Sequence, residues 1–196
     1  MKVLLVYAHP VSESFVAAMR DAALKGLAQA GHEIRLVDLY AENFEPRLSR
    51  QERLDYEDET KNTAQVRKHI DDLEWAEGLV FVFPTWWYGL PAILKGWFDR
   101  TFAPGIAFHM ADAGKVIRPA LTNIRLLVGI TSCGSPWWFA KYVGEPHRRI
   151  IMRGIRALCA RRCKTVWMAI FNMDSASAEA RTRYLRKIET RMAGLR

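Results

Sequence analysis

The chain has 196 residues, of which 50% are hydrophobic and 26% charged. These totals fit one ordinary globular domain, and no stretch approaches the roughly 20 consecutive apolar residues of a membrane-spanning helix. Three cysteines, an odd number, argue against a disulfide framework and favour a reducing, cytoplasmic setting.

The net charge of +8 is concentrated in the last third of the chain. From Lys141 onward there are 14 Lys+Arg against 4 Asp+Glu, whereas residues 1–140 contain 15 against 17. The basic residues recur along predicted amphipathic helices rather than in a tail, so we interpret most of them as solvated helix surface and expect no nucleic-acid partner. The functional alternative is attraction for an acidic partner, including a phosphorylated nicotinamide cofactor.

The first part of the chain alternates strand and helix. Lys2–Tyr7 predicts a strand, because its apolar run is too short for the core of a signal peptide. A helix over about 14–30 ends at Gly31, and a second strand covers 33–36 or slightly more. The stretch from 43 to 62 is rich in acids and arginine, and it predicts a long surface excursion.

A helix over about 63–76 leads to Gly78–Phe83, which has no polar alternation and predicts a strand buried on both faces of a parallel sheet. Pro91–Phe102 predicts a helix with proline in its first turn. Between them the turn Pro84–Tyr88, closed by Gly89, contains three aromatic residues. Open α/β sheets bind ligands at such strand ends, and the large flat rings indicate a large flat ligand, for which a flavin is the best fit.

An irregular stretch over 103–123 precedes the rest of the pattern. The elements expected after it are a strand Ile124–Ile130, a small polar turn Thr131–Gly134, a helix from about Glu145 to Cys159, a strand Thr165–Phe171 and a helix Ser175–Ala193.

Five strands alternating with helices predict one α/β domain over residues 1–196, a three-layer sandwich around a five-stranded parallel sheet with helices on both faces. The turn after the first strand contains no glycine, so the G-x-G-x-x-G fingerprint of the dinucleotide-binding fold is absent. The flavodoxin-like strand order 2-1-3-4-5 is therefore favoured.

Three turns at one edge of that sheet carry the expected chemistry. Ser14 is a suitable N-cap, and the helix it begins offers free N–H groups to a phosphate, although capping alone also explains a serine there. The N–H groups of the aromatic turn are free to bond a ligand, while its rings can stack on a conjugated system or fill an interface. Small residues at Thr131–Gly134 let the backbone approach closely.

The same turns carry a resemblance to a known family. His9-Pro10 with Ser14-Phe15, the block from Pro84 to Arg100 and the small turn after the fourth strand resemble the NAD(P)H:quinone oxidoreductases. This flavodoxin-like, FAD-dependent family also includes modulators of drug activity and potassium-efflux ancillary subunits. The resemblance covers most of residues 1–135 and is strongest over 84–100.

The resemblance implies a site for FAD, with FMN as the alternative. The expected cofactor-binding residues are His9, Ser14, Phe15, Val16, Pro84, Thr85, Trp86, Trp87, Tyr88, Thr131, Ser132, Cys133 and Gly134. Two of these positions depart from the family, which often has asparagine at Val16 and Thr-Thr-Gly-Gly in place of Thr131–Gly134.

Further expectations concern the residues around the flavin. The expected acceptor pocket consists of Phe108, His109, Met110, Trp137 and Trp138. The family uses a tyrosine and a histidine to assist charge transfer; Phe139 falls near the tyrosine position, so Tyr142 and His147 become the candidate catalytic residues.

The implied reaction passes a hydride from NAD(P)H through the flavin to a quinone or similar acceptor, by a ping-pong scheme in a cytoplasmic homodimer. One alternative is a regulatory flavoprotein subunit of a potassium-efflux or other transport system, docked to a membrane transporter at the inner face of the membrane. Another is an FMN-dependent azo- or nitroreductase. No metal site is expected, because Cys159 and Cys163 lack further ligands and the acids at 57–59 fit a solvated loop.

Overall fold

A five-stranded parallel sheet forms the centre of the computed structural model, which describes residues 1–110 and 117–195. Its strand order is β2-β1-β3-β6-β7, so the predicted flavodoxin-like order is confirmed. The strands are β1 (Lys2–Tyr7), β2 (Glu33–Asp38), β3 (Gly78–Pro84), β6 (Leu126–Ser132) and β7 (Lys164–Ile170).

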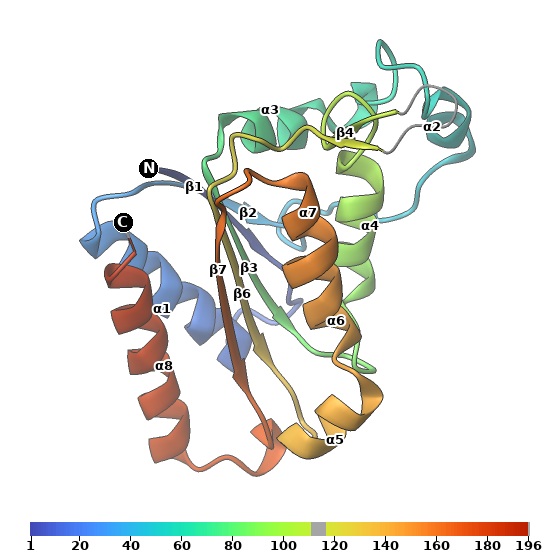
Figure 1. Cartoon of the computed structure of the whole chain (residues 1–196). Helices are drawn as coiled ribbons and strands as arrows, with labels where there is room; N and C mark the ends of the chain where they lie inside the picture. Colours follow the sequence, from blue (N-terminus) through green and yellow to red (C-terminus); the bar gives the residue numbers. More distant parts are fainter. Residues whose placement is uncertain (111–116, 196) are drawn as a thin grey trace.

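Helices cover both faces of the sheet (Figure 1). On one face lie α1 (Phe15–Gln29) and α8 (Ala178–Ala193). On the other lie α3 (Arg67–Trp75), α4 (Ala92–Thr101) and a helical segment made of α6 (Pro146–Arg149), a π-helix (Ile150–Ile155) and α7 (Arg156–Leu158).

Strand side chains alternate between these two apolar layers. In β1, Leu4 and Val6 join the layer under α3 and α4, whereas Val3 and Leu5 join the layer under α1 and α8. Both faces are covered, so the inner strands β3 and β6 are buried along their whole length. This explains why their sequences show no polar alternation.

The Trp167 ring of β7 lies directly over the neighbouring strand at Gly129. A Cβ atom at Gly129 would be 2.3 Å from the Trp167 ring, so glycine is required there for the two strands to keep this packing. The same indole contacts Phe83 and His147, with ring centroids 6.3 and 5.4 Å away. Gly129 thereby makes room for the ring that supports the end of β3.

Two helices differ from the sequence-based expectation. The stretch over 43–62 is not continuous loop, because α2 (Arg50–Asp55) lies within it behind a capping box formed by Ser49 and Glu52. The S-x-x-E pattern was a readable signal for that helix. The aromatic segment after the fourth large strand forms α5 (Trp137–Val143), which ends at Gly144 in the left-handed conformation.

Other element boundaries also differ from the predicted ones. β6 begins and ends two residues later than predicted, so Thr131 and Ser132 belong to the strand rather than to a turn. The stretch over 103–123 contains a small antiparallel ribbon, β4 (Phe108–His109) and β5 (Arg118–Pro119), while its residues 111–116 lie outside the described part. Short 3₁₀ turns cover Ala64–Val66 and Met173–Ser175.

No helix among the described residues is both long and apolar enough to cross a membrane.

A buried ion pair joins α2 to α4. Both Nε and Nη2 of Arg100 lie 2.7 Å from Glu52 Oε1, and Nη1 donates to the Glu45 carbonyl. Burial raises the pKa of the Glu52 carboxyl, but the bonds from Ser49 and Arg100 outweigh it and hold the pKa below its ordinary value. The ion pair therefore holds the segment over 43–62 against α4, which packs on the sheet.

The variant Glu52→Gln tests this anchor. It leaves the Arg100 charge buried without a partner, so we expect the free energy of unfolding at pH 7 to fall by about 3 kcal/mol. Because the folded-state pKa of Glu52 is lowered, its contribution is present above the ordinary carboxyl range and is lost as the pH falls through the folded-state value. Urea titrations at pH 7 and pH 4 should show the gap to wild type narrowing in acid. The exposed-site control Glu57→Gln should match wild type at both values.

Candidate active site

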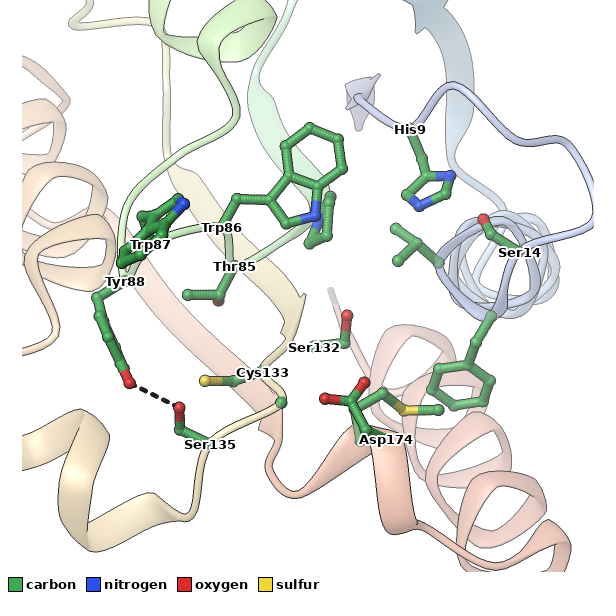
Figure 2. A pocket seen from close by; sticks show the side chains of 15 residues that line it. His9, Ser14, Thr85, Trp86, Trp87, Tyr88, Ser132, Cys133, Ser135 and Asp174 are labelled. Atoms are coloured by element: carbon green, nitrogen blue, oxygen red, sulfur yellow. Dashed lines mark hydrogen bonds between the residues drawn. The ribbon is translucent and has the colours of Figure 1, made fainter.

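One cavity lies at the carboxyl end of the sheet, where the connections after β1, β3, β6 and β7 meet (Figure 2). Its volume of about 910 Å³ is within the range of small-molecule and cofactor sites. The cavity is lined by His9, Ser14, Phe15, Val16, Pro84, Thr85, Trp86, Trp87, Tyr88, Ser132, Cys133, Gly134, Ser135, Met173 and Asp174.

Twelve of the thirteen residues expected to bind a cofactor line this cavity. The exception is Thr131, which is fully buried inside β6. Sequence reasoning missed Ser135, Met173 and Asp174. The predicted strand order did contain a signal for the last two, because the connection after the fifth strand must emerge beside the turn after the fourth.

One wall of the cavity suits an anion. Ser14 caps α1 by accepting from the Ala17 N–H at 3.1 Å, and within the described residues the N–H groups of Phe15 and Val16 have no acceptor. Their partial positive charge adds to that of the helix dipole. His9 accepts from the Val11 N–H at Nδ1, which leaves the Nε2 proton available as a further donor.

The opposite wall is the aromatic turn after β3. Trp87 and Tyr88 occupy the left-handed region with φ of 49° and 59°, a conformation that is costly for bulky residues. Their N–H groups have no protein acceptor within the described part of the chain. The Tyr88 hydroxyl shares a 2.8 Å hydrogen bond with Ser135 Oγ, which ties the turn to the connection after β6, as Figure 2 shows.

His147 holds this turn in place from behind. Its Nδ1–H donates to the Tyr88 carbonyl at 2.7 Å, and Nε2 lies 3.4 Å from Thr85 Oγ1. Thr85 Oγ1 in turn lies 2.8 Å from Thr131 Oγ1, so the buried Thr131 supports the cavity without lining it. His147 is only 2% exposed, and burial lowers its pKa although the Tyr88 bond and Glu145 oppose the shift. The imidazole is therefore neutral near pH 7.

The two candidate catalytic residues lie outside the cavity lining. His147 is packed behind the aromatic turn, between the rings of Phe83 and Trp167. Tyr142 is 83% exposed on α5, beyond Phe139, whose ring lies 5.7 Å from that of Tyr88.

The residues expected to form the acceptor pocket are separated into two groups. Trp137 and Trp138 are exposed on α5, at the same end of the sheet as the cavity. Phe108, His109 and Met110 lie in and beside β4, at the amino-terminal end of the sheet (Figure 1). Within one chain these two groups do not form a common pocket.

The floor of the cavity contains a neutral thiol and an acid. Burial raises the pKa of the Cys133 thiol, with hydrogen bonds to Ser135 opposing the shift, so Cys133 is not an activated nucleophile. Asp174 approaches Gly134 so closely that a Cβ atom there would be 2.5 Å from Oδ2. Gly134 thus lets the carboxylate reach the cavity wall.

The described residues contain no group of three or more His, Cys, Asp or Glu side chains placed to hold a metal ion. The cavity instead combines aromatic faces, free backbone donors and an anion-binding helix terminus. Such a set can hold a planar heterocycle joined to a phosphate, and it contains no activated nucleophile.

Comparison with known proteins identifies the class. The flavodoxin-like fold family matches residues 1–192, so the chain belongs to that family. Among its relatives is the human ribosyldihydronicotinamide dehydrogenase [quinone], 37% identical over 159 residues, or 71% of this chain and 67% of the relative. The rat NAD(P)H dehydrogenase [quinone] 1 is 35% identical over 156 residues, which are 68% of this chain and only 54% of that protein.

Solved structures agree with this placement. Smu.1420 from Streptococcus mutans superposes with a TM-score of 0.85 at 28% identity, covering 100% of both chains. The NAD(P)H:quinone oxidoreductase of Methanothermobacter marburgensis gives 0.84 at 25% identity, covering 100% of this chain and 99% of its own. The chain is a member of the NAD(P)H:quinone oxidoreductase family, and thus an oxidoreductase, as the resemblance implied.

The variant His147→Leu tests the support of the aromatic turn. It leaves the buried Tyr88 carbonyl without its donor, and we expect the free energy of unfolding at pH 7 to fall by about 1–3 kcal/mol. Because the folded-state pKa of His147 is lowered, its contribution is complete above the ordinary value of 6.5 and is lost as the pH falls below it.

Chemical denaturation from pH 5 to pH 8 should therefore show a rise in wild-type stability that is shallower in His147→Leu. The exposed-site control His109→Leu should keep the wild-type profile. If His147→Leu has full stability and an unchanged profile, the hydrogen bond to Tyr88 does not hold the turn.

Proposed function

We propose that this chain binds FAD in the cavity at the carboxyl end of the sheet and transfers hydride from NAD(P)H to a quinone or related aromatic acceptor. One observation carries the proposal: free backbone donors and aromatic rings face a capped helix N-terminus across a single cavity of about 910 Å³. A flavin has the matching parts, a planar ring system and a phosphate. FMN is the alternative, because it shares both.

Different residues of the cavity would bind different parts of the flavin. The N–H groups of Phe15 and Val16, with the His9 imidazole, would hold the phosphates, since donors at a helix N-terminus favour negative charge. The N–H groups of Trp87 and Tyr88 would bond the polar edge of the ring system.

When bound, the flavin supplies the capacity to accept and release a hydride. The residues lining the cavity would orient the rings and exclude water from them. The neutral Cys133 thiol and the buried Thr131 would add no charge next to the bound ring system. Trp86 and Trp87 are exposed beside the cavity, and the nicotinamide and the acceptor would occupy this same side in turn, which predicts ping-pong kinetics.

The placement of the expected acceptor residues supports a homodimer. Phe108, His109 and Met110 lie at the opposite end of the sheet from the cavity of their own chain. They can serve as acceptor-pocket residues only if a second copy presents them to this cavity. We therefore propose that the working unit is a dimer with acceptor pockets shared between copies.

Purification provides the direct test of the proposed function. We expect a yellow protein whose absorbance shows flavin bands, whose extracted cofactor is identified as FAD by chromatography, and which oxidises NAD(P)H when a simple quinone is added. Initial rates at varied concentrations of both substrates should give parallel double-reciprocal lines. Folded protein that stays colourless after reconstitution with FAD and FMN would contradict the proposal.

The variant Trp87→Ala should lose flavin on gel filtration, because it removes an aromatic wall that is 96% exposed and contributes little to the fold. We expect the dissociation constant for flavin to rise by about tenfold, as one stacking contact is worth roughly 1–1.5 kcal/mol. The matched control is Cys159→Ala, a buried site directly after α7 and outside the cavity lining, which should retain flavin as wild type does. Equal losses in both variants would remove Trp87 from the site.

The alternatives predict different outcomes in the same assays. A regulatory flavoprotein subunit would bind flavin and turn over quinone slowly, while associating with a membrane transporter. An FMN-dependent azo- or nitroreductase would release FMN and prefer azo or nitro acceptors. Three azoreductase structures similar to this chain are 18% identical or less and support only the shared fold.

A further inference from the structure

A second, smaller pocket lies between the end of α5 and the helical segment that follows. Its volume is about 310 Å³, and four of its lining residues are cationic: Lys141, Arg148, Arg149 and Arg153. These are the first basic residues of the charge-rich last third of the chain. The other charged lining residue is Glu145.

The charges in this pocket are unbalanced. Glu145 Oε2 lies 3.0 Å from Arg148 Nη1, and this ion pair uses the pocket's one carboxylate. Within the described part of the chain, Lys141, Arg149 and Arg153 form no ion pair. Three uncompensated cations around one small concave surface attract an anion and repel one another in its absence.

The lack of a side chain at Gly144 leaves room for one of these cations. Gly144 has φ of 94°, a left-handed conformation that suits glycine, and it ends α5. The guanidinium of Arg149 lies 3.5 Å from the position that a Cβ atom at Gly144 would occupy. A guanidinium held flat against a surface in this way presents its planar N–H donors toward an oxyanion.

The pocket is connected to the candidate active site through His147 and a row of aromatic rings. His147, which bonds to the aromatic turn, lies in the chain between the pocket residues Glu145 and Arg148. On the exposed side, rings continue from Tyr88 through Phe139 to Tyr142, with centroid spacings of 5.7 and 5.9 Å. An extended molecule seated over the cavity can therefore follow this row of rings to the cationic pocket.

We propose that this pocket binds the 2′-phosphate of NADPH, so that the enzyme prefers NADPH to NADH. The inference rests on the proposed function and names its electron donor. The pocket is large enough for a phosphate and part of a ribose, and it is too small for a whole dinucleotide. NADH presents a neutral hydroxyl where NADPH presents a phosphate dianion, so the cations discriminate between the two by charge.

Two variants of equal charge change test the assignment. Arg149→Ala combined with Arg153→Ala removes two cations from the pocket. Arg183→Ala combined with Arg186→Ala removes two cations from α8, outside the pocket lining, and serves as the control. Because both variants lose two positive charges, a general change in net charge cannot separate them.

The kinetic readout is the KM for each nucleotide with a simple quinone. We expect wild type to have a KM for NADPH at least tenfold below that for NADH, about what one charge-assisted hydrogen bond provides. The pocket variant should raise the KM for NADPH by tenfold or more while leaving the KM for NADH within about twofold of wild type. The α8 variant should change neither KM. Raising the salt concentration should weaken the binding of NADPH more than the binding of NADH.

A binding readout separates this inference from the proposed function. Isothermal titration of the full chain with adenosine 2′,5′-bisphosphate and with AMP measures the pocket without turnover. Tighter binding of the bisphosphate that the pocket variant abolishes supports the site, even if no quinone is reduced. Equal binding of the two nucleotides, or a preference unchanged in the pocket variant, overturns the site even if NADH reduces quinone rapidly.

Discussion

The parallel direction of the five strands is the constraint on which the rest of this molecule depends. Parallel strands end at one common edge, and backbone groups beyond the last ladder hydrogen bond must find other partners or a ligand. Here four connections meet at that edge, and the N–H groups at Phe15, Val16, Trp87 and Tyr88 have no protein acceptor within the described residues. The cavity therefore lies where the helix and the turn that follow the strands leave backbone donors free for a ligand.

The aromatic turn shows how such an edge is made rigid. Two successive bulky residues in the left-handed region would relax in an isolated peptide, because each carries a steric cost. Three contacts from elsewhere in the chain oppose that relaxation: His147 on the Tyr88 carbonyl, Ser135 on its hydroxyl and Thr131 on Thr85. The strain is thus held by the far half of the sequence, which couples the shape of the site to complete folding.

Much of the fold was predictable because its signals are local or periodic. The unbroken apolar run of β3, the glycine-free first turn and the alternation of elements together favoured the observed strand order. The helix α5 was not predicted, because Trp137 and Trp138 have the composition of a binding surface and their helical conformation depends on the left-handed end at Gly144. α2 was missed although its capping box was readable.

The site could be predicted from the sequence about as well as the fold. Residues on the three turns could be assigned because each follows a recognisable strand. The positioning of His147 behind the aromatic turn could not be foreseen, since a histidine at a helix start gives no sign of whether it faces inward or outward. The presence of Asp174 in the cavity wall depends on Gly134 having no side chain, a contact between residues 40 positions apart.

The π-helix between α6 and α7 has a consequence for how this chain tolerates change in length. Its hydrogen bonds span one residue more than those of an α-helix, so the segment accommodates an extra residue in the same axial length. Before it, in α6, His147 must face the aromatic turn, and after α7 Cys159 must meet Leu121. Deleting one residue from Ile150–Ile155 would give an ordinary helix that keeps both ends in place, whereas deleting one residue from the α-helical turns beside it would rotate the two ends by about 100° relative to each other. The π-helix therefore makes this segment the one place between the two attachments where the chain can lose a residue without turning either attachment away from its partner.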